Sequence, residues 1–314
     1  MDFVLKAKIK LGVSACNFGA KFRYNRAGWD RVQSLGRERD EYTWTPVCPE
    51  VLAGLGVPRQ PVKLSGGSGD DLWAGNAKMK NRMGRDVSEA VKVASLACMD
   101  ALHRAGVDAF LFMEGSPTCG VYRTTLKDKR LGKPPGVFGS LLLKERIFLI
   151  PVLDVESPWK WWDHTRRIHA FVWLKKLEIT SKKDIYEAWH ALKFICQEID
   201  RPLSEDIGRS VAALTGKLTP SDIESWRGRI LALLRRPSTL IRIQSVMSKH
   251  YAHYRKVFGL KVVEAQAPSG MLGKAVFVAE LVKMERKAAE QGYLFAGRPV
   301  LYKPGRYCLL PAEC

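Results

Sequence analysis

The sequence VDAFLFMEGSPTCG, residues 107–120, joins a short apolar run to a turn that carries a cysteine. The apolar part, Val107–Phe112, is typical of a buried β-strand. Gly115 and Gly120, with a proline between them, end this strand and predict a tight turn. Cys119 is therefore expected to lie just beyond the carboxyl end of a strand.

Two other cysteines stand in the same position relative to a predicted strand. Cys16 follows the predicted strand Ile9–Ala15, and Cys48 follows the predicted strand Tyr42–Val47. In an open α/β sheet the carboxyl ends of parallel strands lie along one edge, and ligands bind in the crevice outside them. We therefore expect Cys16, Cys48 and Cys119 to meet at one site.

The first half of the chain, residues 1–155, alternates predicted strands with predicted helices. A fourth strand is expected over Ile147–Val152, and the clearest helix over Asp86–Ala105, where apolar residues recur at helical spacing. Such alternation predicts an α/β fold with an open, mostly parallel sheet and helices on both faces. Residues 57–76, rich in Pro, Gly and Ser, are interpreted as one long loop.

The second half, residues 156–314, has mainly helical periodicity, and we expect a second, mostly α-helical domain there. Short strands are expected only in the tail, Tyr293–Leu310. The predicted helices are Asp184–Ile199, Pro220–Arg236, Thr239–Phe258 and Gly273–Gln291.

Composition restricts the class of protein. The net charge of +19 over 314 residues is spread over both halves, and it favours a polyanionic partner such as nucleic acid. A solvated basic surface without a specific partner is the alternative. No apolar stretch reaches the roughly 18 residues of a membrane span, and the N-terminus lacks a signal-peptide pattern, so we expect a cytoplasmic protein. Nothing in the sequence indicates an obligate protein partner.

The cysteine pattern argues against two common uses of this residue. The seven cysteines are irregularly spaced and include no CxxC pair, which disfavours a disulfide framework and a zinc ribbon. Three gathered thiolates favour an iron–sulfur cluster, in which a [4Fe-4S] cube with three protein ligands leaves one iron open as a Lewis acid. The alternative is three unrelated buried cysteines. The other four are interpreted as structural, with a fourth-ligand role left open for one of the last three: Cys98, Cys196, Cys308 and Cys314.

The motifs around the three strand-end cysteines resemble a known family. Ser14-Ala15-Cys16, Val47-Cys48-Pro49-Glu50 and Gly115–Gly120 resemble the three signatures of the thiouracil desulfidase family, in the family's order. The resemblance covers about residues 5–152. Connecting motifs agree as well: Val57–Pro61, Asp71–Gly75 and Gly84–Ser88.

This resemblance implies a [4Fe-4S] cluster held by Cys16, Cys48 and Cys119, whose open iron takes the sulfur of a thiocarbonyl base. It also implies that Glu50 acts as general base on water and that Ser116 hydrogen-bonds the substrate or relays a proton. Sulfide would leave without net redox change. The structural alternatives are that Glu50 stabilises the start of a helical turn and that Ser116 only shapes its own turn.

Smaller features of the same half are open to interpretation. The sequence departs from the usual family pattern at Asn17 and Thr118, and neither change removes a proposed ligand. Arg59 is interpreted either as a phosphate contact or as a solvated cation.

Some relatives join the desulfidase domain to a helical domain and act on 4-thiouridine in transfer RNA, and the outline here is similar. This implies a thiolated nucleobase as substrate and transfer RNA as partner. The alternatives are desulfuration of free thiouracil, or a non-enzymatic nucleic-acid-binding iron–sulfur protein.

Two features of the second half bear on RNA binding. The Trp residues of Trp159–Arg167 either stack on bases or bury into the domain interface. His250 and His253 are interpreted as surface or nucleic-acid contacts. A basic helix face is expected from Arg227, Arg229, Arg235, Arg236, Arg242, Lys249, Arg255 and Lys256.

Overall fold

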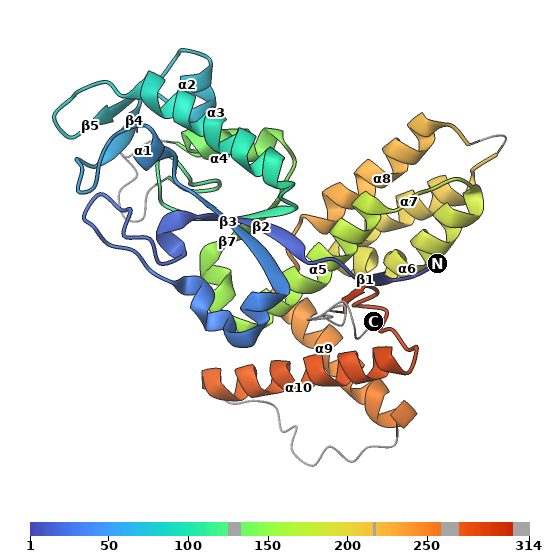
Figure 1. Cartoon of the computed structure of the whole chain (residues 1–314). Helices are drawn as coiled ribbons and strands as arrows, with labels where there is room; N and C mark the ends of the chain where they lie inside the picture. The colour runs from blue at the N-terminus through green and yellow to red at the C-terminus, as the bar shows by residue number, and fades with distance from the viewer. Residues whose placement is uncertain (125–132, 216–217, 259–269, 304–314) are drawn as a thin grey trace, which may run out of the picture. The chain divides into compact units, whose positions relative to one another are not determined.

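The computed structural model describes residues 1–124, 133–215, 218–258 and 270–303. The chain divides into two compact units (Figure 1). One unit is Ile9–Glu156, and the other combines Met1–Lys8 with Ser157–Cys314. The expected boundary between residues 155 and 156 lies one residue from this division. The first eight residues, however, belong to the helical unit.

A four-stranded parallel sheet forms the centre of the first unit. Its strands are β2 (Ile9–Ser14), β3 (Tyr42–Val47), β6 (Ala109–Phe112) and β7 (Phe148–Pro151), in the order β3-β2-β6-β7. All four residues of β6 are buried, which is what an apolar run in the middle of a covered parallel sheet predicts. The expected α/β fold is confirmed.

Helical segments cover both faces of this sheet (Figure 1). Helices α3 (Ser88–Ala105) and α4 (Val137–Lys144) pack together on one face, and two 3-10 segments, Arg31–Glu41 and Val152–Glu156, lie on the other. The predicted apolar stripe of α3 is buried and includes Cys98, which confirms this cysteine as a core residue.

The interpretation of residues 57–76 as one loop is wrong. They contain strand β4 (Val62–Ser65), which pairs antiparallel with β5 (Lys78–Asn81), and helix α2 (Gly69–Trp73). A capping box starts α2, because the Ser68 hydroxyl accepts from the backbone N–H of Asp71 while the Asp71 carboxylate accepts from that of Ser68. This S-x-x-D spacing is a helix-start signal inside a Gly-rich stretch. Helix α1 (Pro49–Leu52) precedes this region.

The second unit is mostly helical, as predicted. Helix α7 was not expected as a separate element, and its N-cap Asp200, which accepts from the N–H of Leu203, explains the break from the preceding helix. A short parallel pair, β1 (Val4–Leu5) with β8 (Leu301–Tyr302), completes the unit. Cys308 and Cys314 lie outside the described residues. The helices are α5 (Pro158–Lys176), α6 (Lys182–Ile199), α7 (Arg201–Ala212), α8 (Pro220–Leu234), α9 (Leu240–Phe258) and α10 (Gly270–Glu290).

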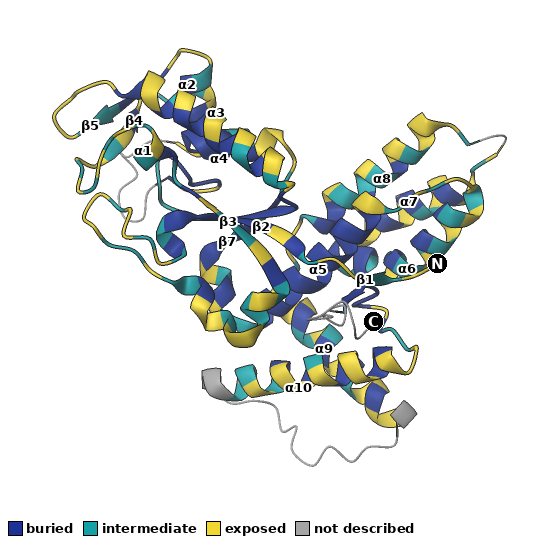
Figure 2. Ribbon diagram, viewed as in Figure 1, coloured by how far each residue is buried: buried dark blue, intermediate teal, exposed yellow. Residues whose placement is uncertain are grey.

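Helix α5 is buried along most of its length (Figure 2). Trp159, Trp161 and Trp162 are only 8, 6 and 1% exposed, so they are buried and not available to stack on bases. Trp159 and Trp162 pack in a core within the second unit. Its charged residues are also buried. Burial opposes ionisation of Asp163, but the adjacent Arg167 and Arg166 guanidinium groups outweigh it and hold the pKa of that carboxyl below its usual value.

Much of the predicted basic face of this unit is engaged within the unit. Arg227 pairs with Glu224, Arg229 with Asp206 and Arg236 with Asp200. Arg242 donates to the carbonyls that end α6, those of Glu198 and Ile199. These contacts leave fewer cations for an RNA surface than the sequence suggests.

The two histidines of α9 also have partners inside the unit. His250 is buried, and its Nδ1 lies 2.8 Å from a carboxylate oxygen of the buried Glu285, so its interpretation as a surface contact is wrong. His253 is exposed and contacts the hydroxyl of Tyr293.

Candidate active site

The three strand-end cysteines line one cavity in the first unit. Its volume is about 360 Å³, and Glu50 and Ser116 line it together with Cys16, Cys48 and Cys119. The cysteines follow three adjacent strands, β2, β3 and β6. Strand β3 lies on one side of β2, and β6 lies on the other side. The loops after β2 and β6 therefore flank a topological switch point. The sheet order thus explains why this crevice is open.

Cys16 and Cys48 are held by short helical segments. Cys16 lies in the 3-10 helix Ala15–Asn17, and the fully buried Asn17 directs its side-chain Nδ2 at the Cys16 sulfur, 3.6 Å away. Cys48 immediately precedes α1, where burial raises the pKa of its thiol and the backbone N–H of Val51 partly offsets this. Both cysteines are partly exposed.

Cys119 is positioned by a turn whose shape depends on the side chain of Ser116 and on Gly120. The Ser116 hydroxyl accepts from the backbone N–H groups of Thr118 (3.2 Å) and Cys119 (3.0 Å). A Cβ on Gly120 would lie 2.2 Å from the carbonyl oxygen of Arg123 and 2.6 Å from that of Ser116, so only glycine fits there. The Glu114 carboxylate accepts from three N–H groups beyond the turn, at residues 121–123. Ser116 therefore shapes the turn, as the structural alternative proposed, while also lining the cavity.

Burial and mutual proximity affect the charge of the three thiols. Burial, followed by the nearby Cys48, raises the pKa of Cys16 to about 11. Burial also raises the pKa of Cys48, and it raises that of Cys119 well above its usual value, with Cys48 the next cause. The thiols thus influence one another electrostatically, and a positive charge is required to keep them together as thiolates.

The chemistry of this arrangement suits an iron–sulfur cluster, since cysteine thiolates are its usual ligands. The three cysteines are free and spread around a shared cavity. In an iron–sulfur cluster the thiolates bind different iron atoms, so spread thiols and an intervening cavity suit it.

Glu50 is held in the cavity by two side chains. One carboxylate oxygen accepts from the Thr118 hydroxyl at 2.7 Å, and the other accepts from Arg59, through Nε at 2.9 Å and through Nη2. Arg59 also donates to the carbonyls of Phe22 (2.7 Å) and Gly56 (3.2 Å), and only 5% of its side chain is exposed. Arg59 is therefore not a solvated cation but the partner of the proposed base. The sequence offered no signal for this pair beyond two opposite charges nine positions apart.

Comparisons with known proteins agree with this site. Residues 11–153 match the family model described as 2-thiouracil desulfurase. The uncharacterised protein YbbK of Bacillus subtilis (strain 168) is 32% identical over 135 residues, which are 41% of this chain and 87% of that protein. The solved structure of the [4Fe-4S]-dependent thiouracil desulfidase TudS is 26% identical, with 46% of this chain and 91% of that chain covered and a TM-score of 0.36. The resemblance carried by the cysteine motifs is confirmed, and through residues 11–153 this chain belongs to the 2-thiouracil desulfurase family.

Proposed function

We propose that this protein is a [4Fe-4S]-dependent desulfidase that removes sulfur, as sulfide and without net redox change, from a thiolated nucleobase, with thiouridine in transfer RNA as the substrate. The observation that carries the proposal is the cavity that unites Cys16, Cys48 and Cys119 with the carboxylate of Glu50. Membership of the 2-thiouracil desulfurase family supports the reaction class.

The cluster would be held by Cys16, Cys48 and Cys119. Among the described residues that line the cavity there is no fourth cysteine; Cys98 packs in the core beside Val47 and Cys119 without lining the cavity, and Cys196 is buried in the second unit. A cube with three protein ligands supplies an open iron, which acts as a Lewis acid toward the sulfur of a thiocarbonyl group.

Glu50 is suited to act as general base on the attacking water. A carboxylate offers about four lone-pair positions, and the contacts from Thr118 and Arg59 use three of them. The remaining position can accept a proton from a water molecule in the cavity. Because Thr118 and Arg59 hold the two oxygens separately, the direction of the free lone pair is fixed before substrate arrives.

Ser116 is suited to donate a hydrogen bond to the substrate. A hydroxyl has two acceptor lone pairs and one O–H donor. Both lone pairs of the Ser116 hydroxyl accept hydrogen bonds from backbone N–H groups in the turn, which leaves the O–H free to donate to the nucleobase of the substrate. This assigns Ser116 to substrate binding in preference to proton relay, because its oxygen has no vacant lone pair to receive a proton.

The net charge of +19 and the second, helical unit support transfer RNA as substrate. The ion pairs of Arg227, Arg229 and Arg236 favour the alternative, free thiouracil, because they remove cations from the predicted basic face. We place the enzyme in the cytoplasm, where the five free cysteines among the described residues remain reduced. Within the same part of the chain, no helix combines the length and apolar character needed to cross a bilayer.

The test is strictly anaerobic purification followed by measurement of iron and acid-labile sulfide. We expect about four of each per chain, and loss of both in Cys119→Ala. Sulfide release is then assayed with thiouridine-containing transfer RNA and with free thiouracil. Glu50→Gln should retain the cluster and lose activity. An active Glu50→Gln refutes the general-base role, and iron-free protein refutes the cluster.

A further inference from the structure

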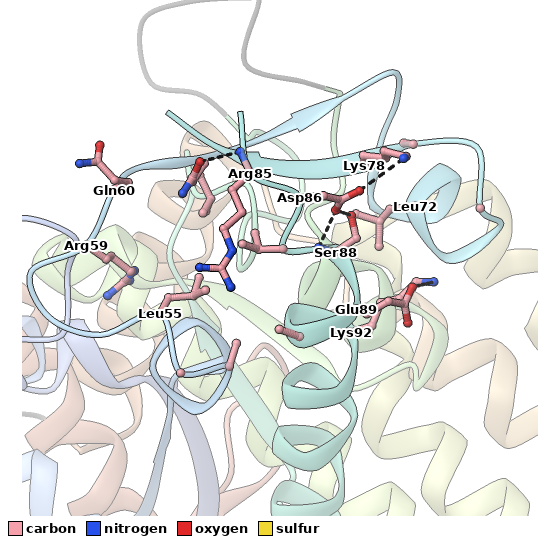
Figure 3. A pocket seen from close by; sticks show the side chains of 18 residues that line it. Leu55, Arg59, Gln60, Leu72, Lys78, Arg85, Asp86, Ser88, Glu89 and Lys92 are labelled. Carbon is pink, nitrogen blue, oxygen red and sulfur yellow. Dashed lines mark hydrogen bonds and ion pairs between the residues drawn. The ribbon is translucent and has the colours of Figure 1, made fainter. Parts of the chain in front are cut away.

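A second cavity borders the cysteine cavity and has no role in the site described above. Its volume is about 590 Å³, within the range of pockets that hold small organic ligands. It lies between the end of α1, the β4–β5 pair and the start of α3 (Figure 3). Arg59 and Val62 line both cavities, so the two lie next to each other.

Arg85 directs its side chain into this cavity (Figure 3). Its backbone N–H donates to the side-chain oxygen of Asn81 at 2.9 Å. Its guanidinium group, in contrast, forms no hydrogen bond or ion pair with any residue in the described part of the chain. Arg85 is exposed, so its guanidinium group is available to a ligand that enters the cavity.

The remaining charges at the cavity nearly balance, which leaves Arg85 as the excess. Lys78 pairs with Asp86 (3.5 Å) and Lys92 with Glu89 (3.0 Å). Helix α3 also begins at this cavity, but the Asp86 carboxylate accepts from the backbone N–H of Ser88 in its first turn at 3.0 Å, so the helix start adds little to the charge of Arg85. The cavity thus favours a ligand with one anionic group.

The same cavity has an apolar wall. Leu55, Val62 and Leu72 contribute to it from three different elements. An apolar wall that faces a free guanidinium group suits a nucleotide, since the base packs on apolar or guanidinium surfaces while the phosphate binds the charge.

We propose that this cavity binds the nucleotide next to the thiolated nucleotide in an RNA strand. The thiolated base occupies the cysteine cavity, the neighbouring base packs on the apolar wall, and its phosphodiester binds Arg85. This inference rests on the proposed function and deepens it, because it makes an RNA strand, rather than a free base, the ligand that fits both cavities.

The test is binding of a fluorescently labelled, unthiolated single-stranded RNA trinucleotide to the full-length protein, measured by fluorescence anisotropy. Arg85→Ala should weaken binding about tenfold, the typical loss for one stacking or phosphate contact. The matched control is Arg82→Ala, which removes the same charge three residues away from an exposed position that does not line the cavity. Its binding should stay within about twofold of the wild type.

Equal losses in the two variants, or no loss in Arg85→Ala, would overturn the proposal. A second arm uses uridine 5′-monophosphate as competitor. If its affinity falls with Arg85→Ala as much as that of the trinucleotide, the cavity binds the substrate's own phosphate, and the assignment to a neighbouring nucleotide is wrong. These measurements need no turnover, so failure of the desulfidase assay refutes the proposed function separately.

Discussion

The contact between Arg59 and Glu50 predicts a measurable coupling between the stability of the first unit and its proposed general base. Arg59→Met keeps most of the side-chain volume but removes every hydrogen bond that the guanidinium group donates. Two of these bonds reach Glu50 and two reach the carbonyls of Phe22 and Gly56. The side chains of the pair are only 5% and 14% exposed, so water replaces these contacts poorly.

The size of the effect follows from this burial. Removal of one partner of a buried ion pair costs about 3–5 kcal/mol, because the other charge is left without compensation. Glu50→Gln removes that charge while keeping the shape, so the double variant Arg59→Met/Glu50→Gln should lose less than the sum of the single variants. We expect a coupling free energy of about 1–3 kcal/mol. With a typical urea m-value of about 2 kcal/mol/M, Arg59→Met alone should lower the midpoint of the first unit by about 2 M.

The assay must report on the first unit alone, because a chain of two units need not unfold in one step. Hydrogen exchange as a function of urea, followed by mass spectrometry of peptides from β2 and β6, gives the free energy of opening of the sheet. Peptides from α6 in the second unit serve as an internal control and should not change. If the single variants add within about 0.5 kcal/mol, the two side chains are not coupled and the assigned contact is wrong.

Three further predictions concern other parts of the chain. Gly120→Ala should lower both the melting temperature and the amount of iron bound after anaerobic purification, because the added Cβ would overlap the turn backbone. The control is Gly228→Ala, where no atom lies within 4 Å of the added Cβ, and its iron content should be unchanged. Arg166→Met should destabilise the second unit by about 3–5 kcal/mol in urea unfolding, since Glu198 and Asp163 both lose a buried cation and Asp163 keeps only Arg167, whereas the exposed Arg201→Met should have a much smaller effect. Backbone N–H of Thr180, then contacts from Ser181, lower the pKa of Asp184 to about 2 from 3.8, so its stabilisation is present above about pH 4 and is lost as the pH falls toward 2. The melting-temperature difference between wild type and Asp184→Ala should therefore narrow over that interval, and a constant difference would contradict the assignment.

The strands that carry the cysteines were predictable because each has a local signal. Each is an apolar or alternating run with Gly or Pro soon after its end; Cys16 and Cys48 lie within two residues of their strands, and Cys119 lies in the turn that follows β6. Strand β4 has no such signal. It alternates Val62 and Leu64 with exposed residues, and its partner β5 is separated from it by helix α2. Such a strand is recognised only when its partner is known.

Helix α5 was ambiguous for a different physical reason. Its charged residues normally mark an exposed face, yet Asp163, Arg166 and Arg167 are buried because they neutralise one another. The spacing of an acid three and four positions before two arginines is the signal that ion pairs can form within the helix. That spacing does not show whether the pairs face water or a core, so the sequence alone left the tryptophans beside them open to both interpretations.

The sequence alone could not predict the contacts of Glu50, the proposed general base. These contacts explain why the turn after β6 must have one fixed conformation. Thr118, 68 positions from Glu50 in the chain, holds one oxygen of that carboxylate from within this turn. Four consecutive residues of the turn, 116–119, thus contain the hydroxyl proposed to bind the substrate, the hydroxyl that orients the proposed general base and one proposed cluster ligand. These groups can act together only if the turn has one conformation. The side chain of Ser116 bonded to the backbone, and a glycine that no larger residue can replace, provide that single conformation. The departure from the usual family pattern at Thr118 preserves this arrangement because threonine retains the hydroxyl that Glu50 requires.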